Sequence, residues 1–309
     1  MRKCFMYIDD THWVFKEIAE TLPNSIYDHP FMAMLKKAHD LYGIKIQLNV
    51  FFRNSFFYGS TEEFSLKEMP DKYKKEWQEA SSWLRFGFHS KEEFPDYPYL
   101  NAKYEDVKKD VEDLKAEIAR FACERSFALG TVPHWNAMSL AGCSALRDAG
   151  VKIMNSTCGP VHEYNGDPTS IPYGHEWRLL HNRQPETRCF SRGDRNTAIA
   201  NSLCAHNHVD DLPSNTDMKT TKVYLDEKTG LYMKVLKNGI ILNLYKLNEL
   251  EDAYKNLIGD EFITTGNHEQ YFYPHYFNYQ PEFADKLLKA AKILSENDYE
   301  FIFLEDLAI

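Results

Sequence analysis

The strongest constraint on the fold is the order in which two kinds of apolar segment follow one another. Short runs rich in β-branched and aromatic residues alternate with longer segments whose apolar residues recur with helical spacing. The strand-like runs are residues 3–8, 44–52, 84–88, 127–132 and 151–155. The helix-like segments are residues 30–42, 71–82, 103–126 and 137–149. This alternation predicts an α/β fold, in which helices cover a parallel sheet.

The alternation is interrupted in the second half of the chain. Residues 156–220 are rich in Gly, Pro, Asn, Asp, His and Arg, and structureless loops of that length are rare in compact domains. Residues 222–245 predict a β-meander with turns at 228–230 and 238–239. We therefore expect a β-rich insertion at 156–245, between the fifth strand and the last strands.

Beyond the insertion the α/β pattern resumes. The expected elements are a helix at 248–258, a strand at 262–266, a helix at 281–297 and a strand at 299–307. Together with the earlier strands they give about seven core strands, which predicts a barrel. We expect one barrel domain over residues 1–309, with the insertion inside it.

Composition and charge restrict the partners of the chain. The 309 residues are 43% hydrophobic, enough for one large core. The net charge of −10 argues against nucleic acid, because phosphate binding needs clustered Lys and Arg. No apolar run approaches the roughly 18 residues of a membrane span, and the N-terminal run is too short for a signal peptide. We therefore expect a cytoplasmic protein, or a mature form whose signal has been removed, without a membrane span.

Ionisable residues stand where the expected strands end. They are Asp9 and Asp10, His89 with Glu92 and Glu93, His134 beside Trp135, His268 and Glu269, and Glu305 and Asp306; Trp135 is the one member of this set that is not ionisable. The carboxyl ends of parallel strands meet at one end of a barrel, where active sites lie. Several ionisable strand ends that converge predict a site that binds a cation or moves protons. The six cysteines form no CxxC pair, which argues against a zinc–cysteine site.

This layout resembles the polysaccharide deacetylase family, also called the NodB-homology or carbohydrate esterase four family. Its first motif, an apolar strand ending in Asp-Asp, is matched by YIDD at 7–10. Its second motif is His-Ser/Thr with another His four residues after the first, and HSKEE at 89–93 has Glu93 at that last position. Its third motif, Arg-x-Pro-x-Trp or Gly, is matched by TVPHW at 131–135, with Thr131 in place of the Arg. The His of its fifth motif corresponds to His268.

The resemblance implies a distorted (β/α)7 barrel of the NodB type and a reaction. The reaction is metal-dependent removal of an N- or O-acetyl group from a carbohydrate or another small polar substrate, with zinc as the expected divalent metal. It implies that Asp9 is the general base and His268 the general acid. The implied metal ligands are Asp10, His89 and Glu93. The residues expected to line the substrate pocket are His134, Trp135, Glu269 and Tyr271.

Two further functions fit the same residues. Glu93 and Thr131 depart from the motifs, which favours a catalytically degenerate barrel that binds a glycan or a small polar ligand. A glycoside hydrolase could instead use two carboxylates, such as Asp9 and Glu269.

Within the expected insertion, His206, His208 and Asp210 alternate along the chain, so an extended segment would place them on one face. An exposed polar loop explains them more simply than a metal site.

Overall fold

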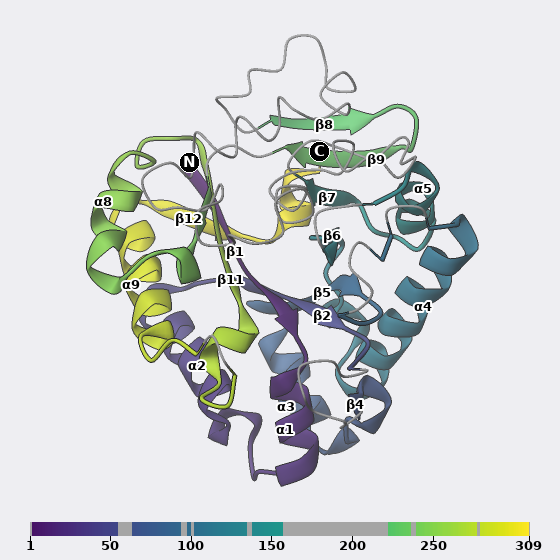
Figure 1. Cartoon of the computed structure of the whole chain (residues 1–309), viewed down its shortest axis with the longest axis horizontal. Helices are drawn as coiled ribbons and strands as arrows, with labels where there is room; N and C mark the ends of the chain where they lie inside the picture. The colour runs from purple at the N-terminus through teal and green to yellow at the C-terminus, as the bar shows by residue number, and fades with distance from the viewer. Residues whose placement is uncertain are drawn as a thin grey trace, which may run out of the picture.

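The structure is a computed structural model with a mixed α/β fold (Figure 1). It describes residues 2–54, 64–93, 98–99, 102–134, 138–156, 222–235, 239–276 and 279–308.

The central strand of the first sheet is β1 (Arg2–Thr11). Along one edge β1 pairs with β11 (Phe262–His268). Two strands share its other edge. β12 (Tyr299–Ile302) pairs with the start of β1, and β2 (Ile46–Phe51) pairs with the later part of β1. The outer strands are β5 (Leu84–Ser90), beside β2, and β10 (Gly239–Ile241), beside β11. All of these pairings are parallel, so the strands end at the same edge.

A second sheet continues beside β5. Its strands, in order, are β6 (Gly130–Thr131), β7 (Ile153–Ser156), β9 (Leu231–Val235) and β8 (Lys222–Asp226). A parallel bridge between Phe86 and Phe127 connects it to β5. Within the described ranges no ladder joins β9 to β10, so these strands do not form a closed barrel.

The expected β-meander is confirmed only in its first two strands. β8 and β9 pair antiparallel, and Gly230 in their turn has the left-handed φ of 70°. The third strand, β10, leaves them and pairs in parallel with β11. At the edge of the main sheet β10 buries Ile240, which is only 1% exposed.

Helices lie on both sides of the strands. In Figure 1, α2 (Pro30–Tyr42), α8 (Leu250–Lys255) and α9 (Phe283–Glu296) are on one side, and α4 (Tyr104–Phe121) and α5 (Leu140–Asp148) are on the other. The remaining α-helices of the described segments are α1 (Trp13–Thr21), after β1, and α3 (Lys74–Ala80), before β5. A small antiparallel pair, β3 (Arg53–Asn54) and β4 (Phe64–Ser65), follows β2.

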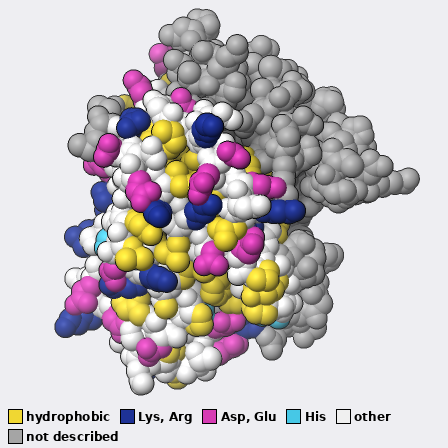
Figure 2. Space-filling view, turned by 90° about the vertical axis from the view of Figure 1, so that its left-hand side faces the viewer, with side chains coloured by type: hydrophobic (Ala, Val, Ile, Leu, Met, Phe, Trp, Pro, Cys, Tyr) yellow, Lys and Arg dark blue, Asp and Glu magenta, His cyan; other side chains and the backbone are white. Residues whose placement is uncertain are grey.

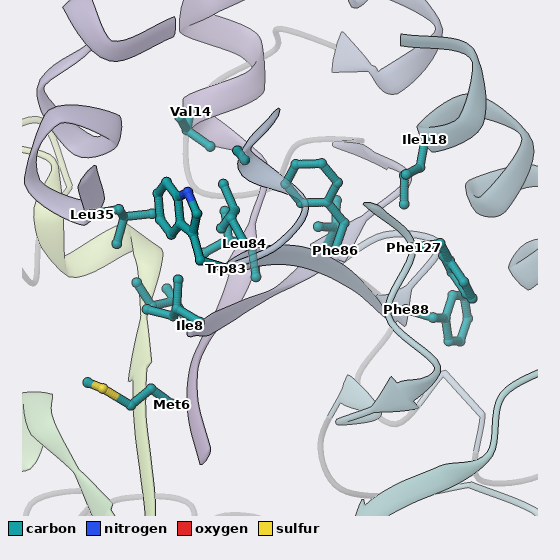
Figure 3. Packing of buried hydrophobic residues seen from close by; sticks show 14 of the residues in the cluster. Met6, Ile8, Val14, Leu35, Trp83, Leu84, Phe86, Phe88, Ile118 and Phe127 are labelled. Atoms are coloured by element: carbon teal, nitrogen blue, oxygen red, sulfur yellow. The ribbon is translucent and has the colours of Figure 1, made fainter. Parts of the chain in front are cut away.

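Apolar residues fill both faces of β1. Met6 and Ile8 face the helices and pack in a large cluster with residues such as Leu35 and Ile118 (Figure 3). Phe5 and Tyr7 point to the opposite face and belong to a smaller cluster between the two sheets. Burial on both faces explains why β1 is an almost continuous apolar run.

The outer surface is mixed in charge. On the side that carries α8 and α9, acidic and basic side chains intermingle with apolar ones (Figure 2). None of the helices in the described ranges is both long enough and apolar enough to cross a membrane.

Candidate metal centre

A backbone irregularity at the end of β1 places two carboxylates at one site. The pairing of β1 with β2 shifts register between Ile8 and Thr11, and Asp10 has a left-handed φ of 58°. In a regular strand Asp9 and Asp10 would point to opposite faces. Here Asp9 Oδ1 lies 3.9 Å from His89 Nδ1, and Asp10 Oδ1 lies 3.1 Å from His89 Nε2. Bulges and strained residues of this kind concentrate at functional sites.

Three buried side chains converge at this point. His89 is the penultimate residue of β5, where a second register shift occurs, and His134 follows β6. Asp10 Oδ1 is 3.1 Å from His89 Nε2 and 3.4 Å from His134 Nδ1, and the two nitrogens are 3.1 Å apart. Asp10, His89 and His134 therefore form a compact group that could hold a metal ion.

Backbone carbonyls fix the tautomers of both histidines. His89 Nδ1 donates to the Val132 carbonyl oxygen, and His134 Nε2 donates to the Glu93 carbonyl oxygen. The other nitrogen of each ring, His89 Nε2 and His134 Nδ1, faces the Asp10 carboxylate and would give up any proton shared with it in order to bind a metal ion. A bonded second nitrogen is the usual arrangement of metal-ligating histidines.

The geometry of the three atoms fits a divalent cation. Ligands that bind zinc at 2.0–2.1 Å in a tetrahedron are about 3.3–3.4 Å apart, close to the three distances observed. Two imidazole nitrogens and one carboxylate suit zinc and other borderline metals better than magnesium or calcium, which prefer oxygen. The side chain of Gln270 donates to Asp10 Oδ2 at 3.0 Å, which leaves Oδ1 directed at the histidines.

The pKa shifts show that the site attracts positive charge. Burial alone would raise the pKa of Asp10, but hydrogen bonds from His134 and His89 hold it well below its usual value. Burial would lower the pKa of His89, and the carboxylates of Asp9 and Asp10 outweigh that effect and raise it. His134 keeps a lowered pKa because of burial and the nearby His89.

A second pair of ionisable residues lies beside the group. Asp9 and His268 are register partners on β1 and β11. Burial raises the pKa of Asp9 to about 6. Asn49 donates to Asp9 Oδ1 at 2.7 Å, and His268 Nδ1 donates to Asn243 Oδ1 at 3.0 Å. The two asparagines thus orient the carboxylate and the ring.

Asn49 and Asn243 did not stand out in the sequence. A signal for Asn49 was available, because Gln47 and Asn49 are polar residues at alternate positions of an apolar strand, and both are buried. Gln47 donates to Asn49 Oδ1 at 2.6 Å and continues the chain of hydrogen bonds. Asn243 lies in a short 3-10 helix after β10, and local sequence carries no comparable signal for it.

The expected ligand Glu93 and the expected pocket residue His134 occupy neighbouring positions. His134 lies in the ligand group, whereas Glu93 lies on the side of His134 that faces away from Asp10. The carboxylate Oε1 of Glu93 is 4.0 Å from His134 Nε2, the nitrogen that points away from Asp10. His134 therefore lies in the position in which Glu93 was expected as the third ligand.

The other expected pocket residues are placed differently. Glu269 is fully buried, and its carboxylate accepts hydrogen bonds from the backbone N–H groups of His12, Trp13 and Val14. The ring of Tyr271 lies 6.1 Å from that of His268, beside the site. Trp135 and the His206–His208–Asp210 cluster lie outside the described residues.

Comparison with known proteins gives likeness at the level of fold. No family model matches the chain, and no curated protein matches it. The 4-alpha-glucanotransferase from Thermococcus litoralis has a similar structure, with a TM-score of 0.52 and 11% identity over 99% of this chain. This chain spans 40% of that enzyme. A protein described as a polysaccharide deacetylase from Mycobacterium smegmatis has a TM-score of 0.44 and 9% identity, over 99% of this chain and 89% of its own.

Proposed function

We propose that the chain is a metal-dependent hydrolase that removes an N- or O-acetyl group from a carbohydrate, on a divergent, distorted barrel of the deacetylase type. The observation that carries the proposal is the convergence of Asp10, His89 and His134, with Asp9 and His268 beside them. The carbohydrate substrate is inferred from the order of the sequence motifs. The net charge of −10 disfavours nucleic acid.

The residues divide into two sets of roles. Asp10, His89 and His134 would hold the cation, for which zinc is the best fit. A divalent cation there would polarise the acyl carbonyl and acidify a water molecule. Asp9 would accept a proton from the attacking water, whose oxygen forms the new bond to the carbonyl carbon. His268 would donate a proton to the leaving nitrogen or oxygen as its bond to that carbon breaks.

The two motif departures are offset by neighbouring residues, which favours an enzyme over a degenerate binding protein. Thr131 replaces the motif Arg, and Asn49 binds the Asp9 carboxylate instead. Glu93 replaces a motif His, and His134 supplies the second imidazole.

A glycoside hydrolase that uses Asp9 and Glu269 is less well supported. Glu269 bonds to three backbone N–H groups and to the Tyr273 hydroxyl. A nucleophile or acid would have to leave these partners.

The test is metal content combined with acetate release. Purified wild-type protein should bind about one Zn²⁺ per chain and release acetate from acetylated oligosaccharides. His134→Ala should weaken Zn²⁺ binding at least 10–100-fold, because even the loss of an outer-shell partner costs that much. The matched change Glu93→Gln keeps the backbone carbonyl that holds His134 and should leave Zn²⁺ affinity within a few-fold.

The results of these measurements test the ligand assignment and the hydrolase function separately. Equal metal affinity in wild type and His134→Ala contradicts the ligand assignment. Stoichiometric metal without acetate release from any acetylated sugar contradicts the hydrolase and leaves a glycan-binding barrel.

A further inference from the structure

A cavity lies beside the segment that follows β11, the strand that carries His268. It has a volume of about 300 Å³, the low end for small-molecule pockets. Its walls come from α1, the start of α2, the segment that follows β11 and the first turn of α9. The size suits one small ring better than an extended ligand.

One side of the cavity is aromatic. Phe272 and Tyr273 are fixed by ring contacts, with centroids 5.3 Å apart and Phe31 5.2 Å from Phe272. Tyr279 differs from them, because it is 40% exposed at the rim. An aromatic face that is free at a cavity mouth is suited to stacking on an apolar ring face.

The other side carries a hydrogen-bonded histidine and carboxylate. His29 Nε2 lies 2.8 Å from Glu17 Oε2, and the His29 side chain is only 5% exposed. His29 Nδ1 has no hydrogen-bond partner in the described part of the chain and is closed off from the cavity, so it is not a contact for a ligand there. The second oxygen of Glu17 has no partner in the described part of the chain, and the Glu17 side chain is 35% exposed. The wall thus offers the Glu17 carboxylate as an acceptor to hydroxyl groups, and the same carboxylate disfavours anions.

Hydrogen bonds and ring contacts connect this cavity with the site. Gln280 in its wall donates to the backbone carbonyl of Asn243, whose side chain holds His268. His275 in its wall lies 4.9 Å from Trp13, the first residue of α1. A ligand in the cavity would therefore contact a residue that holds Asn243, which orients the proposed acid His268.

We propose that this cavity binds one uncharged sugar ring, with its apolar face on Tyr279 and its hydroxyls on Glu17. The proposal rests on the proposed function, because it makes the cavity a subsite for a sugar unit remote from the acyl group that is removed.

The test is direct sugar binding, measured by NMR titration of the full-length protein with methyl β-glucoside, methyl N-acetyl-β-glucosaminide and the anionic methyl β-glucuronide. The neutral glycosides should bind and the glucuronide should bind more weakly. Tyr279→Ala should weaken neutral binding roughly 5–10-fold, whereas Tyr279→Phe, which keeps the ring, should stay within about twofold. Glu17→Gln should reduce the discrimination against the glucuronide.

Removal of the metal by a chelator, or Asp10→Ala, should leave this binding unchanged. Neutral binding that Tyr279→Ala does not weaken, or that Asp10→Ala abolishes, overturns the subsite. If neutral sugars bind in a way that depends on Tyr279 but the protein releases no acetate, the hydrolase proposal is contradicted and the subsite proposal is not. Acetate release without any Tyr279 effect contradicts the subsite alone.

Discussion

At the scale of single residues, the positions that matter most are polar side chains in apolar surroundings. Asp10, Asn49 and Lys234 are all buried on strands, and different partners offset the cost of burying each polar group. Asp10 faces two imidazoles, and Asn49 belongs to a hydrogen-bond chain. Lys234 donates to Asn155 Oδ1 at 2.8 Å and Thr264 Oγ1 at 2.6 Å, and the described ranges place no carboxylate within ion-pair distance of it.

We expect the stability of the folded protein to depend on pH because Lys234 is buried. Burial lowers its pKa well below the usual value, whereas an unfolded lysine has a pKa of about 10.4. Between these two values the unfolded state binds more protons, so the free energy of unfolding should rise with pH up to about 10. Lys234→Met should remove this rise. At neutral pH it removes the cost of deprotonating Lys234 but loses the hydrogen bonds to Asn155 and Thr264, so the pH slope is the decisive readout.

Denaturant unfolding at neutral and alkaline pH measures the effect. The exposed Lys75→Met is the control and should keep the wild-type slope. An unchanged pH slope in Lys234→Met would mean that Lys234 is charged in the folded state.

At the scale of elements, helices whose signals are local were predicted well and those that depend on distant residues were not. α2 covers the predicted 30–42 and ends at Gly43 in the left-handed conformation. α1 was missed, because no side chain near its start caps it. The capping carboxylate is Glu269, more than 250 residues away. No local pattern could reveal that partner.

This cap predicts that Glu269 is needed for stability. Glu269→Ala would leave the N–H groups of His12, Trp13 and Val14 without a buried acceptor and should cost about 2–3 kcal/mol or more. Glu20→Ala, on the exposed side of the same helix, should change the free energy of unfolding by less than about 0.5 kcal/mol. Denaturant unfolding of both variants provides the comparison. A fully stable Glu269→Ala protein would instead favour a role for Glu269 at the substrate.

At the scale of the whole molecule, the ligand group connects the two sheets. Asp10 and His89 come from the first sheet, and His134 follows β6 of the second. A cation bound by all three would stabilise the folded state only, since the ligands are far apart in an unfolded chain.

Zinc should therefore raise the melting temperature. At 100 times its dissociation constant, a ligand that binds only the folded state adds about 2.7 kcal/mol, which corresponds to several degrees. The same concentration of Mg²⁺ should have a much smaller effect. Thermal unfolding with each metal, for wild type and Asp10→Ala, measures this. An equal Zn²⁺ shift in Asp10→Ala would place the metal elsewhere.

The sequence alone determined the α/β class, most helices and strands, and the strand ends at which Asp9, Asp10, His89, His134 and His268 stand. These depend on apolar periodicity and turn residues, which are local. Only the tertiary structure decided which of these residues meet. A bulge and a left-handed Asp10 bring both aspartates to one site, His134 joins Asp10 and His89 where Glu93 was expected, and β10 moves from the hairpin to the main sheet. Each of these outcomes depends on contacts between residues far apart in sequence, which no local pattern specifies.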